Sequence, residues 1–321
     1  MKNNQNIPII EVKHLKKYFN TAKGKLHAVD DVSFQIQEGT TLGVVGESGC
    51  GKSTLGRTIL RLLEPTEGEI LYRGTDITGF DKKRMKNIRQ KLQMIFQDPY
   101  SSIDPRMTVA GIIAEPMHVL KLYKSDKEIN QKVSEIMQTV GLAERFANSY
   151  PHELDGGRRQ RIGIARALAL NPEFIVCDEP VSALDVSIQA QILNLLMDLQ
   201  EQRNLTYVFI THDMSVVKHI SKQIAVMYLG QCVEYSDTDE LFDHPQHPYT
   251  QALLNAIPIP DLRERSKEIQ TIQGEVSNPI NPAPGCRFAA RCPYVTDKCT
   301  EKNFGLKEVS SGHFVACTQY A

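Results

Sequence analysis

The chain has 321 residues, of which 41% are hydrophobic and 23% charged, so a disordered or low-complexity protein is excluded. Lys and Arg total 37 against 38 Asp and Glu, which is not the basic excess of a nucleic-acid-binding protein. No apolar run reaches the roughly 20 residues needed to cross a bilayer, and the mean hydropathy is -0.30. The polar start, MKNNQN, lacks the apolar stretch of a signal peptide, so we expect a cytosolic protein.

The first hundred residues are predicted to alternate between strands and helices. Lys52–Leu63 has its apolar residues at helical spacing, whereas shorter runs rich in β-branched and aromatic residues predict strands. The predicted strands are Ile9–Val12, Val32–Ile36, Thr41–Val45, Glu69–Tyr72 and Leu92–Phe96.

Helical periodicity dominates from about residue 101 to 170, and the alternation then resumes. The helices predicted in this block are Val109–Leu120, Lys127–Val140 and Gly157–Leu170. The elements predicted after it are strand Phe174–Cys177, helix Val186–Arg203, strand Tyr207–Ile210, helix Met214–Ile220 and strand Gln223–Tyr228. The pattern indicates a parallel-sheet α/β core interrupted by a helical insertion.

The composition changes near residue 258. Eight of the 16 prolines lie between Pro245 and Pro293, and four of the seven cysteines fall in the last 36 residues. The tail has few periodic apolar residues, which favours a small appendage held together by a metal over a second ordinary core.

A phosphate-binding loop is predicted after the strand Thr41–Val45. Residues 46–54 fit G-x-x-x-x-G-K-[ST] and open a predicted helix, which is the context that the motif requires. Backbone N–H groups and the helix N-terminus would hold a polyphosphate, Lys52 would neutralise it, and the Ser53 hydroxyl would bind Mg²⁺. The predicted nucleotide contacts are Gly46, Glu47, Ser48, Gly49, Cys50, Gly51, Lys52, Ser53 and Thr54.

Two carboxylates and a histidine follow apolar strands further along the chain. Asp178 and Glu179 end the run Phe174–Cys177, so Asp178 can hold Mg²⁺ through water while Glu179 polarises an attacking water. His212 closes the strand Tyr207–Ile210 after one threonine, as expected for a residue that reaches a γ-phosphate. A lone histidine at a strand end is more often structural. A functional role for His212 is supported only by its occurrence together with the phosphate-binding loop and the Asp178/Glu179 pair.

The order of these motifs resembles the nucleotide-binding subunits of ABC transporters. The resemblance covers residues 9 to about 235 and rests on the phosphate-binding loop, Gln97 in 96–99, the segment 154–161, the Asp178/Glu179 pair, 182–185 and His212. It implies an α/β fold: a P-loop ABC-type nucleotide-binding domain with a RecA-like core, an antiparallel β portion and a helical subdomain at about 98–170. This domain is expected to span 1–257, with a small Cys-rich C-terminal appendage, of the oligopeptide/dipeptide-transporter type, over 258–321.

The resemblance also implies a mechanism. Two such domains clamp two ATP molecules, each between the P-loop of one and the signature motif of the other, and hydrolysis drives membrane partners. The roles that it implies are Tyr18 (or Phe19) on adenine, Gln97 as a sensor of Mg²⁺ that contacts the membrane subunits, Glu179 and His212 in catalysis, and Asp185 in coupling the two sites. The Mg²⁺ ligands would be Ser53, Gln97 and Asp178, and the signature residues Asp155, Gly156, Gly157 and Arg158.

A narrower similarity links the chain to the oligopeptide/dipeptide/nickel importer ATPases. It is carried by Glu47 and by the segments 96–106, 247–254 and 284–293. It implies a peripheral subunit at the cytoplasmic face of the cell membrane that powers peptide uptake and does not bind nucleic acid. Its partners would be a second, non-identical ATPase subunit, two transmembrane permeases and, indirectly, an extracytoplasmic binding protein. The alternatives are a nickel or other small-solute importer, or a soluble ABC ATPase without a transport role.

The signature departs from the family pattern at one position. The family has Leu-Ser-Gly-Gly, whose serine hydroxyl donates to the γ-phosphate, and here Asp155 replaces that serine. Two unit charges ~4 Å apart repel by roughly 4 kcal/mol at an effective dielectric of ~20, and the Arg158 cation offsets part of this. We therefore expect a weak or non-hydrolysing site at this signature, and hence a heterodimer, unless Asp155 turns away from the nucleotide.

The terminal cysteines are spaced Cys286-x5-Cys292-x6-Cys299-x17-Cys317. This lacks the C-x2-C knuckles of most zinc sites and the usual ferredoxin spacings, so the spacing alone leaves zinc and an iron–sulfur cluster open. The similar importer ATPases imply a 4Fe–4S cluster. His313 is a possible substitute ligand, although we expect a surface residue.

Overall fold

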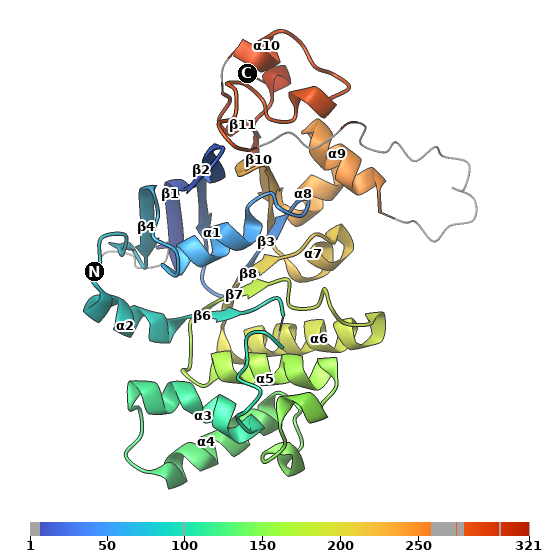
Figure 1. Cartoon of the computed structure of the whole chain (residues 1–321). Helices are drawn as coiled ribbons and strands as arrows, with labels where there is room; N and C mark the ends of the chain where they lie inside the picture. The colour runs from blue at the N-terminus through green and yellow to red at the C-terminus, as the bar shows by residue number, and fades with distance from the viewer. Residues whose placement is uncertain (1–6, 99, 258–273, 275–278, 302, 321) are drawn as a thin grey trace, which may run out of the picture. The chain divides into compact units, whose positions relative to one another are not determined.

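The computed structural model describes residues 7–98, 100–257, 274, 279–301 and 303–320. The chain divides into two compact units, one made of residues 1–79 and 209–321 and the other of residues 80–208 (Figure 1). Pro99 of the predicted 96–99 motif and the expected boundary at residue 258 lie outside the described residues. The described residues from 279 onward belong to the first unit.

The first unit contains both ends of the chain and is mainly β-structure in its first part. Its elements up to residue 79 are β1 (Ile10–Thr21), β2 (Gly24–Ile36), β3 (Thr41–Val45), α1 (Lys52–Ile59), β4 (Glu67–Tyr72) and β5 (Thr75–Asp76). After the chain returns in β8 (Thr206–Ile210), it adds α7 (Met214–Ile220), β9 (Gln223–Tyr228), β10 (Gln231–Asp237), α8 (Thr238–Asp243), α9 (Pro248–Asn255), η4 (Ala289–Arg291), α10 (Lys298–Glu301), β11 (Lys307–Ser310), β12 (His313–Val315) and η5 (Thr318–Tyr320).

An antiparallel sheet in the order β2-β1-β4-β5 forms the antiparallel portion that the resemblance implies. β1 and β2 are a long hairpin that pairs Ile10 with Ile36 at its base and Thr21 with Gly24 at its tip. Both strands are longer than predicted, because polar residues beyond Val12 pair across the hairpin and register shifts interrupt their alternation.

A second run of strands places the phosphate-binding loop. β3 is buried throughout and lies parallel to β9, and β10, β12 and β11 continue outward from β9 in antiparallel pairings. Tyr228 at the end of β9, Tyr249 of α9 and Phe288 pack together in the buried core of this unit. A residue of the Cys-rich tail is therefore part of that core.

The second unit is mainly helical, as the periodicity predicts. Its elements are α2 (Lys82–Lys91), β6 (Leu92–Ile95), α3 (Val109–Leu120), α4 (Asp126–Thr139), η1 (Glu144–Phe146), η2 (Pro151–Glu153), α5 (Gly156–Leu168), β7 (Phe174–Asp178) and α6 (Val186–Arg203). β6 and β7 are parallel, and the side chains of Thr108 and Ser125 cap α3 and α4 by accepting the N–H groups of Gly111 and Glu128. In the part of the chain that the structure describes, no helix is both long and apolar enough to pass through a bilayer.

Candidate functional site

The phosphate-binding loop joins the C-terminal end of β3 to the start of α1, as predicted. Gly46 has φ 149° and Gly51 has φ 103°, and both are packed against backbone. A Cβ on Gly46 would lie 2.1 Å from the carbonyl oxygen of Met227, and one on Gly51 would lie 1.9 Å from that of Ala28. Only glycine fits either position, so the loop is held tightly against β9 and β2.

Lys52 opens helix α1 and is almost fully buried. Its Nζ donates to the carbonyl oxygens of Gly46 at 2.7 Å and Glu47 at 2.9 Å, so the ammonium lies inside the curve of the loop. The helix cap, Gly51, supplies no side-chain acceptor. A cation and a helix N-terminus thus face the same loop, an arrangement suited to a polyphosphate.

Glu47, in the middle of the loop, is tied to two residues far along the chain. Its backbone N–H donates to the Tyr249 hydroxyl at 2.8 Å, and its carboxylate pairs with the Arg291 guanidinium at 2.9 Å. Glu47 is a predicted nucleotide contact, whereas the sequence gives no local signal for a role of Tyr249 or Arg291.

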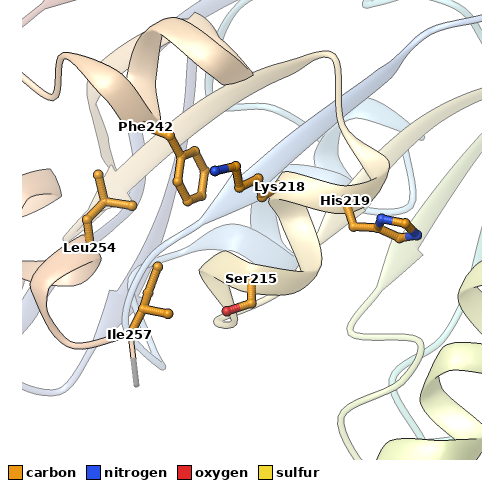
Figure 2. A pocket seen from close by; sticks show the side chains of 6 residues that line it. All are labelled: Ser215, Lys218, His219, Phe242, Leu254 and Ile257. Atoms are coloured by element: carbon orange, nitrogen blue, oxygen red, sulfur yellow. The ribbon is translucent and has the colours of Figure 1, made fainter. Parts of the chain in front are cut away.

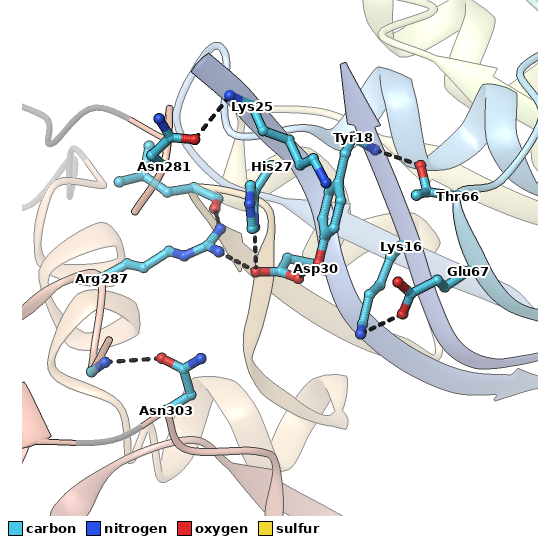
Figure 3. Close-up of polar contacts among 12 residues, drawn as sticks. Lys16, Tyr18, Lys25, His27, Asp30, Thr66, Glu67, Asn281, Arg287 and Asn303 are labelled. Carbon is cyan, nitrogen blue, oxygen red and sulfur yellow. Dashed lines mark hydrogen bonds and ion pairs between the residues drawn. The ribbon is translucent and has the colours of Figure 1, made fainter. Parts of the chain in front are cut away.

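Tyr18 lies in a polar group around Asp30 (Figure 3). Its hydroxyl donates to the Asp30 carboxylate, and its ring stacks on His27 with centroids 4.0 Å apart. Burial raises the pKa of Tyr18, so the phenol remains a donor. Burial alone would also raise the pKa of Asp30, but hydrogen bonds from Tyr18 and His27 and the charge of Arg287 together lower it. Asp30 is therefore a carboxylate that gathers three donors.

His212 lies at the same end of the first unit as the loop. The N–H of Thr211, the preceding residue, donates to the carbonyl of Val44 in β3 at 3.1 Å. Asp213, the next residue, caps α7 by accepting the N–H groups of Ser215 and Val216. His212 itself is exposed. A strand contact on one side and a helix cap on the other fix the backbone around it.

The second unit carries the predicted carboxylates and glutamine. Asp178 is buried at the end of β7, and Glu179 follows it with φ 46°, a left-handed conformation that is costly for a non-glycine residue. Gln97 Nε2 donates to Glu179 Oε2 at 2.9 Å. The structure therefore brings together two of the three predicted catalytic residues, and strained backbone of this kind is typical of functional sites.

The signature motif forms the start of α5. Asp155 caps the helix: Oδ1 accepts the N–H of Arg158 at 2.8 Å, while Oδ2 pairs with the Arg158 guanidinium at 2.7 Å. Gly157 packs closely on α6, because a Cβ there would lie 2.7 Å from Ile188 Cγ2. A Cβ on Gly156 would lie 3.1 Å from Leu184 Cδ2. The charge of the Asp155 carboxylate, which occupies the serine position, is thus balanced by the N–H and guanidinium groups of Arg158 in the same helix.

Asp185 caps the next helix, α6. Its Oδ1 accepts the Ile188 N–H at 3.0 Å and the Ser187 hydroxyl at 2.7 Å. Those two hydrogen bonds, led by that of the backbone, lower the pKa of Asp185. The residue is exposed, so its carboxylate is an anion at the surface of the second unit.

The four terminal cysteines meet at one small cavity in the first unit, which Cys286, Cys292, Cys299 and Cys317 all line. Cys299 Sγ also lies 3.3 Å from the Thr318 hydroxyl. Within the described ranges, no group of three or more His, Cys, Asp or Glu side chains has an arrangement that could hold a metal ion. The predicted ligands thus line one cavity, with their thiols not gathered around a single metal-ion position.

His313 is not the surface residue that the sequence suggested. It is fully buried, with Nε2 at 2.7 Å from Glu234 Oε1 and Nδ1 at 3.2 Å from Glu240 Oε1. It does not line the cysteine cavity. The expectation was wrong because the carboxylates that accommodate the ring lie more than 70 residues away in the sequence.

A separate pocket lies between α7 and the helices α8 and α9 (Figure 2). Lys218 and His219 of α7 face it together with Phe242, Leu254 and Ile257, and Lys218 Nζ lies 4.6 Å from the centroid of the Phe242 ring. Its described lining combines three apolar side chains with one lysine, whereas the loop 46–54 places Lys52 and a helix N-terminus together. The candidate nucleotide site is therefore the loop 46–54.

The parallel strands, the strand–loop–helix turn and the antiparallel sheet define a P-loop ATPase of the ATP-binding cassette class. A family model described as "ABC transporter" matches residues 29–182, and another, "Oligopeptide/dipeptide transporter, C-terminal region", matches residues 233–299. Among solved structures, a dimeric post-hydrolysis ATP-binding cassette bound to ADP and Pi superimposes with a TM-score of 0.66 at 31% identity, covering 71% of this chain and 98% of the other. The chain is accordingly an ATPase of this class.

Two relatives match almost the whole chain. The putative oligopeptide transport ATP-binding protein YkfD of Bacillus subtilis is 53% identical over 98% of this chain and 96% of its own length. The dipeptide transport ATP-binding protein DppF of Haemophilus influenzae is 48% identical over 98% of this chain and 97% of its own. The chain belongs to the family of ATP-binding proteins of oligopeptide and dipeptide transporters.

Proposed function

We propose that the chain is the ATP-hydrolysing subunit of an importer that takes up peptides, working at the cytoplasmic face of the cell membrane. The observation that carries the proposal is that one chain combines the P-loop with the oligopeptide/dipeptide transporter region at residues 233–299. Its partners are two membrane-embedded permeases, reached from outside by a substrate-binding protein. The relatives named for oligopeptide and dipeptide transport support peptides as the cargo.

The test is peptide uptake in cells that carry Lys52→Ala in the chromosomal copy of this chain. Loss of uptake of radiolabelled di- and oligopeptides, with nickel accumulation unchanged, is the expected result. Loss of nickel accumulation alone would replace the peptide cargo by nickel, and unchanged uptake of both would remove the transport role. Co-purification of the chain with two hydrophobic membrane subunits would separate a transporter from an ABC ATPase without a transport role.

The reaction we propose is in-line attack of water on the γ-phosphate of ATP, which breaks the bond to the oxygen that bridges the β- and γ-phosphates and releases ADP and inorganic phosphate. Lys52 and the loop N–H groups bind the polyphosphate, Tyr18 stacks on adenine, Glu179 polarises the water, His212 reaches the γ-phosphate and Gln97 senses Mg²⁺. Mg²⁺ neutralises phosphate charge, and hydroxyl, amide and carboxylate oxygens suit it as ligands, which supports Ser53, Gln97 and Asp178 in that role. The Gln97–Glu179 hydrogen bond is the local geometry that favours this assignment.

We further propose that the ATPase pair is a heterodimer. The carboxylate of Asp155 accepts hydrogen bonds and, when ionised, has no proton to donate to a phosphate, unlike a serine hydroxyl. The Arg158 guanidinium pairs with this carboxylate and balances its charge. The pairing does not restore the hydrogen bond that a serine hydroxyl would donate from the same position. The partner's signature would then complete the site at this chain's P-loop. Equal turnover at both sites of a dimer formed by this chain alone would contradict the proposal.

The tail is proposed to hold a 4Fe–4S cluster as part of a Cys-rich C-terminal extension over 258–321, with zinc as the alternative. The chemistry of the donor set supports it, because four thiols that line one cavity suit either centre. The chain's contribution would be Cys286, Cys292, Cys299 and Cys317 as ligands. Anaerobic purification followed by assays for iron, zinc and acid-labile sulfide decides between them. Iron and sulfide in near-equal amounts support the cluster, and zinc without sulfide refutes it.

A further inference from the structure

Two arginines stand between the first two terminal cysteines, in the segment 286–292 (CRFAARC), and both point into the first unit. Arg287 follows Cys286 directly, and Arg291 directly precedes Cys292. Their side chains are only 6% and 7% exposed, so each guanidinium is committed to partners inside the protein. Those partners lie at the two ends of the proposed nucleotide site.

Arg291 serves the phosphate end. Its Nη1 pairs with the Glu47 carboxylate at 2.9 Å and lies 3.3 Å from the Tyr228 hydroxyl. Glu47 places an anion inside a loop that has to accept a polyphosphate, and like charges in such a loop repel. The guanidinium cancels that charge and, together with the Tyr249 hydroxyl on the Glu47 N–H, fixes the direction of the loop.

Arg287 serves the other end. Its guanidinium pairs with Asp30 and donates to the carbonyl of Leu229 (Figure 3). Asp30 accepts the hydroxyl of Tyr18, the residue proposed to stack on adenine, so a chain of two contacts joins Arg287 to that ring. The same Asp30 carboxylate lies 3.1 Å from His27 Nδ1. Without Arg287, the Asp30 carboxylate that accepts the Tyr18 hydroxyl would have only His27 as its other side-chain partner among these residues.

The backbone of this region is firmly attached to the rest of the unit. Residues 279–281 lie against β2, with Ile280 bridging Leu26 and the Asn281 side chain accepting the N–H of Lys25 at 2.9 Å (Figure 3). Between the arginines, Phe288 is buried against Tyr228 and Tyr249 with ring centroids 5.2 Å and 5.4 Å apart. The arginines are therefore presented by an anchored segment, which is what a fixed charge at a binding site requires.

We propose that Arg287 and Arg291 are positioning residues of the ATP site, so that the segment 286–292 sets the affinity of this chain for ATP. Arg291 sets the phosphate end through Glu47, and Arg287 sets the base end through Asp30 and Tyr18. The proposal rests on the nucleotide site proposed above and goes beyond it, because no residue after Tyr249 has a part in that site otherwise.

The experiment measures dissociation constants of the full-length chain for Mg·ATP and for Mg·tripolyphosphate, which lacks the base. Arg291→Gln is expected to weaken both ligands about tenfold, a usual size for coupling between sites, and Arg291→Lys to recover part of the loss. Arg287→Gln is expected to weaken ATP by a similar factor and to leave tripolyphosphate unchanged. The matched control is Arg73→Gln, which removes an arginine from the exposed pair with Glu38 in the same unit.

A double variant separates positioning from simple loss of structure. Glu47→Gln combined with Arg291→Gln removes both partners of the ion pair, so the double variant should bind tripolyphosphate more tightly than Arg291→Gln alone. The proposal is overturned if the double variant binds as weakly as Arg291→Gln, or if both arginine variants bind like the control. If the wild type does not bind ATP, or Lys52→Ala binds it equally well, the proposed nucleotide site fails instead.

Discussion

Gln97 donates a 2.9 Å hydrogen bond to the carboxylate of Glu179, a residue 82 positions later in the sequence. Glu179 sits in a left-handed backbone conformation directly after the buried Asp178. The backbone conformation of Glu179 and the hydrogen bond from the Gln97 amide together fix the orientation of its carboxylate. A fixed orientation is expected of a general base that activates a water molecule.

Glu179→Gln should retain ATP binding and lose turnover by at least about a hundredfold, because the amide cannot accept a proton while its shape is unchanged. Steady-state hydrolysis in the assembled transporter and nucleotide binding to the same sample provide the two numbers. Hydrolysis at the wild-type rate would remove Glu179 from the reaction.

Lys52→Ala should weaken Mg·ATP binding by roughly a hundredfold or more, because it removes the ammonium enclosed by the loop. Equilibrium dialysis with the purified chain measures the effect. The control is Lys132→Ala, which breaks an exposed pair with Glu135 on α4. An unchanged dissociation constant for Lys52→Ala would refute the phosphate-binding role of the loop.

Asp155→Ser should keep helix α5 capped and restore a hydroxyl at the signature, since serine and aspartate cap helices about equally well. We expect little change in the free energy of unfolding and stronger ATP-dependent self-association of the chain. Asp155→Ala should instead cost about 1 kcal/mol of stability, because the cap is lost. Sedimentation with and without ATP reports the association. Self-association equal in all three proteins would argue against a weakened signature.

The pH dependence of stability should show the pairing of His313 with Glu234 and Glu240. Burial lowers the pKa of His313, but hydrogen bonds and charge from the two carboxylates outweigh it, and the net pKa is raised. A raised folded-state pKa stabilises the protein fully below the unfolded-state value of about 6.5, and the stabilisation is lost as pH rises through the folded-state value.

Thermal unfolding of wild type and His313→Gln between about pH 5 and 9 tests this expectation. The difference in Tm should be largest at the acid end and shrink as the pH rises. His14→Gln is the control, because His14 lies beside Asp31 with its side chain 80% exposed. A difference in Tm that grows with pH would show that His313 is neutral in the folded protein.

Much of the fold could be predicted because its signals are local. The loop 46–54, the strand β3 and the helices α3 to α6 follow from spacing over a few residues, and each lies within a few residues of its prediction. Helix α1 is an instructive exception: it ends at Ile59 rather than Leu63, because Arg61 adopts φ 53° and turns the chain, which leaves Leu62 exposed.

Long-range partnerships could not be predicted in the same way. The sequence shows that Arg287 and Arg291 are each adjacent to a cysteine. It does not show their ion-pair partners, because Glu47 is 244 residues from Arg291 and Asp30 is 257 residues from Arg287. The only available signal was chemical: Glu47 is an anion in a loop built for anions, and such a residue needs a cation nearby. His313 was misjudged for the same reason, since nothing near it in the chain identifies a buried carboxylate.

The pairing of β12 with β10 has a consequence for the behaviour of the protein in crowded solution. A chain that ended before residue 307 would present the open backbone of β10, a strand of seven residues, to any other strand. In this chain β12 pairs with Glu234 and Tyr235 of that strand, and among the described residues the outermost strand becomes β11, which is four residues long and begins with Lys307 and Glu308. Short, charged outer strands resist edge-to-edge pairing, so residues 307–315 make this sheet edge a poorer template for other strands.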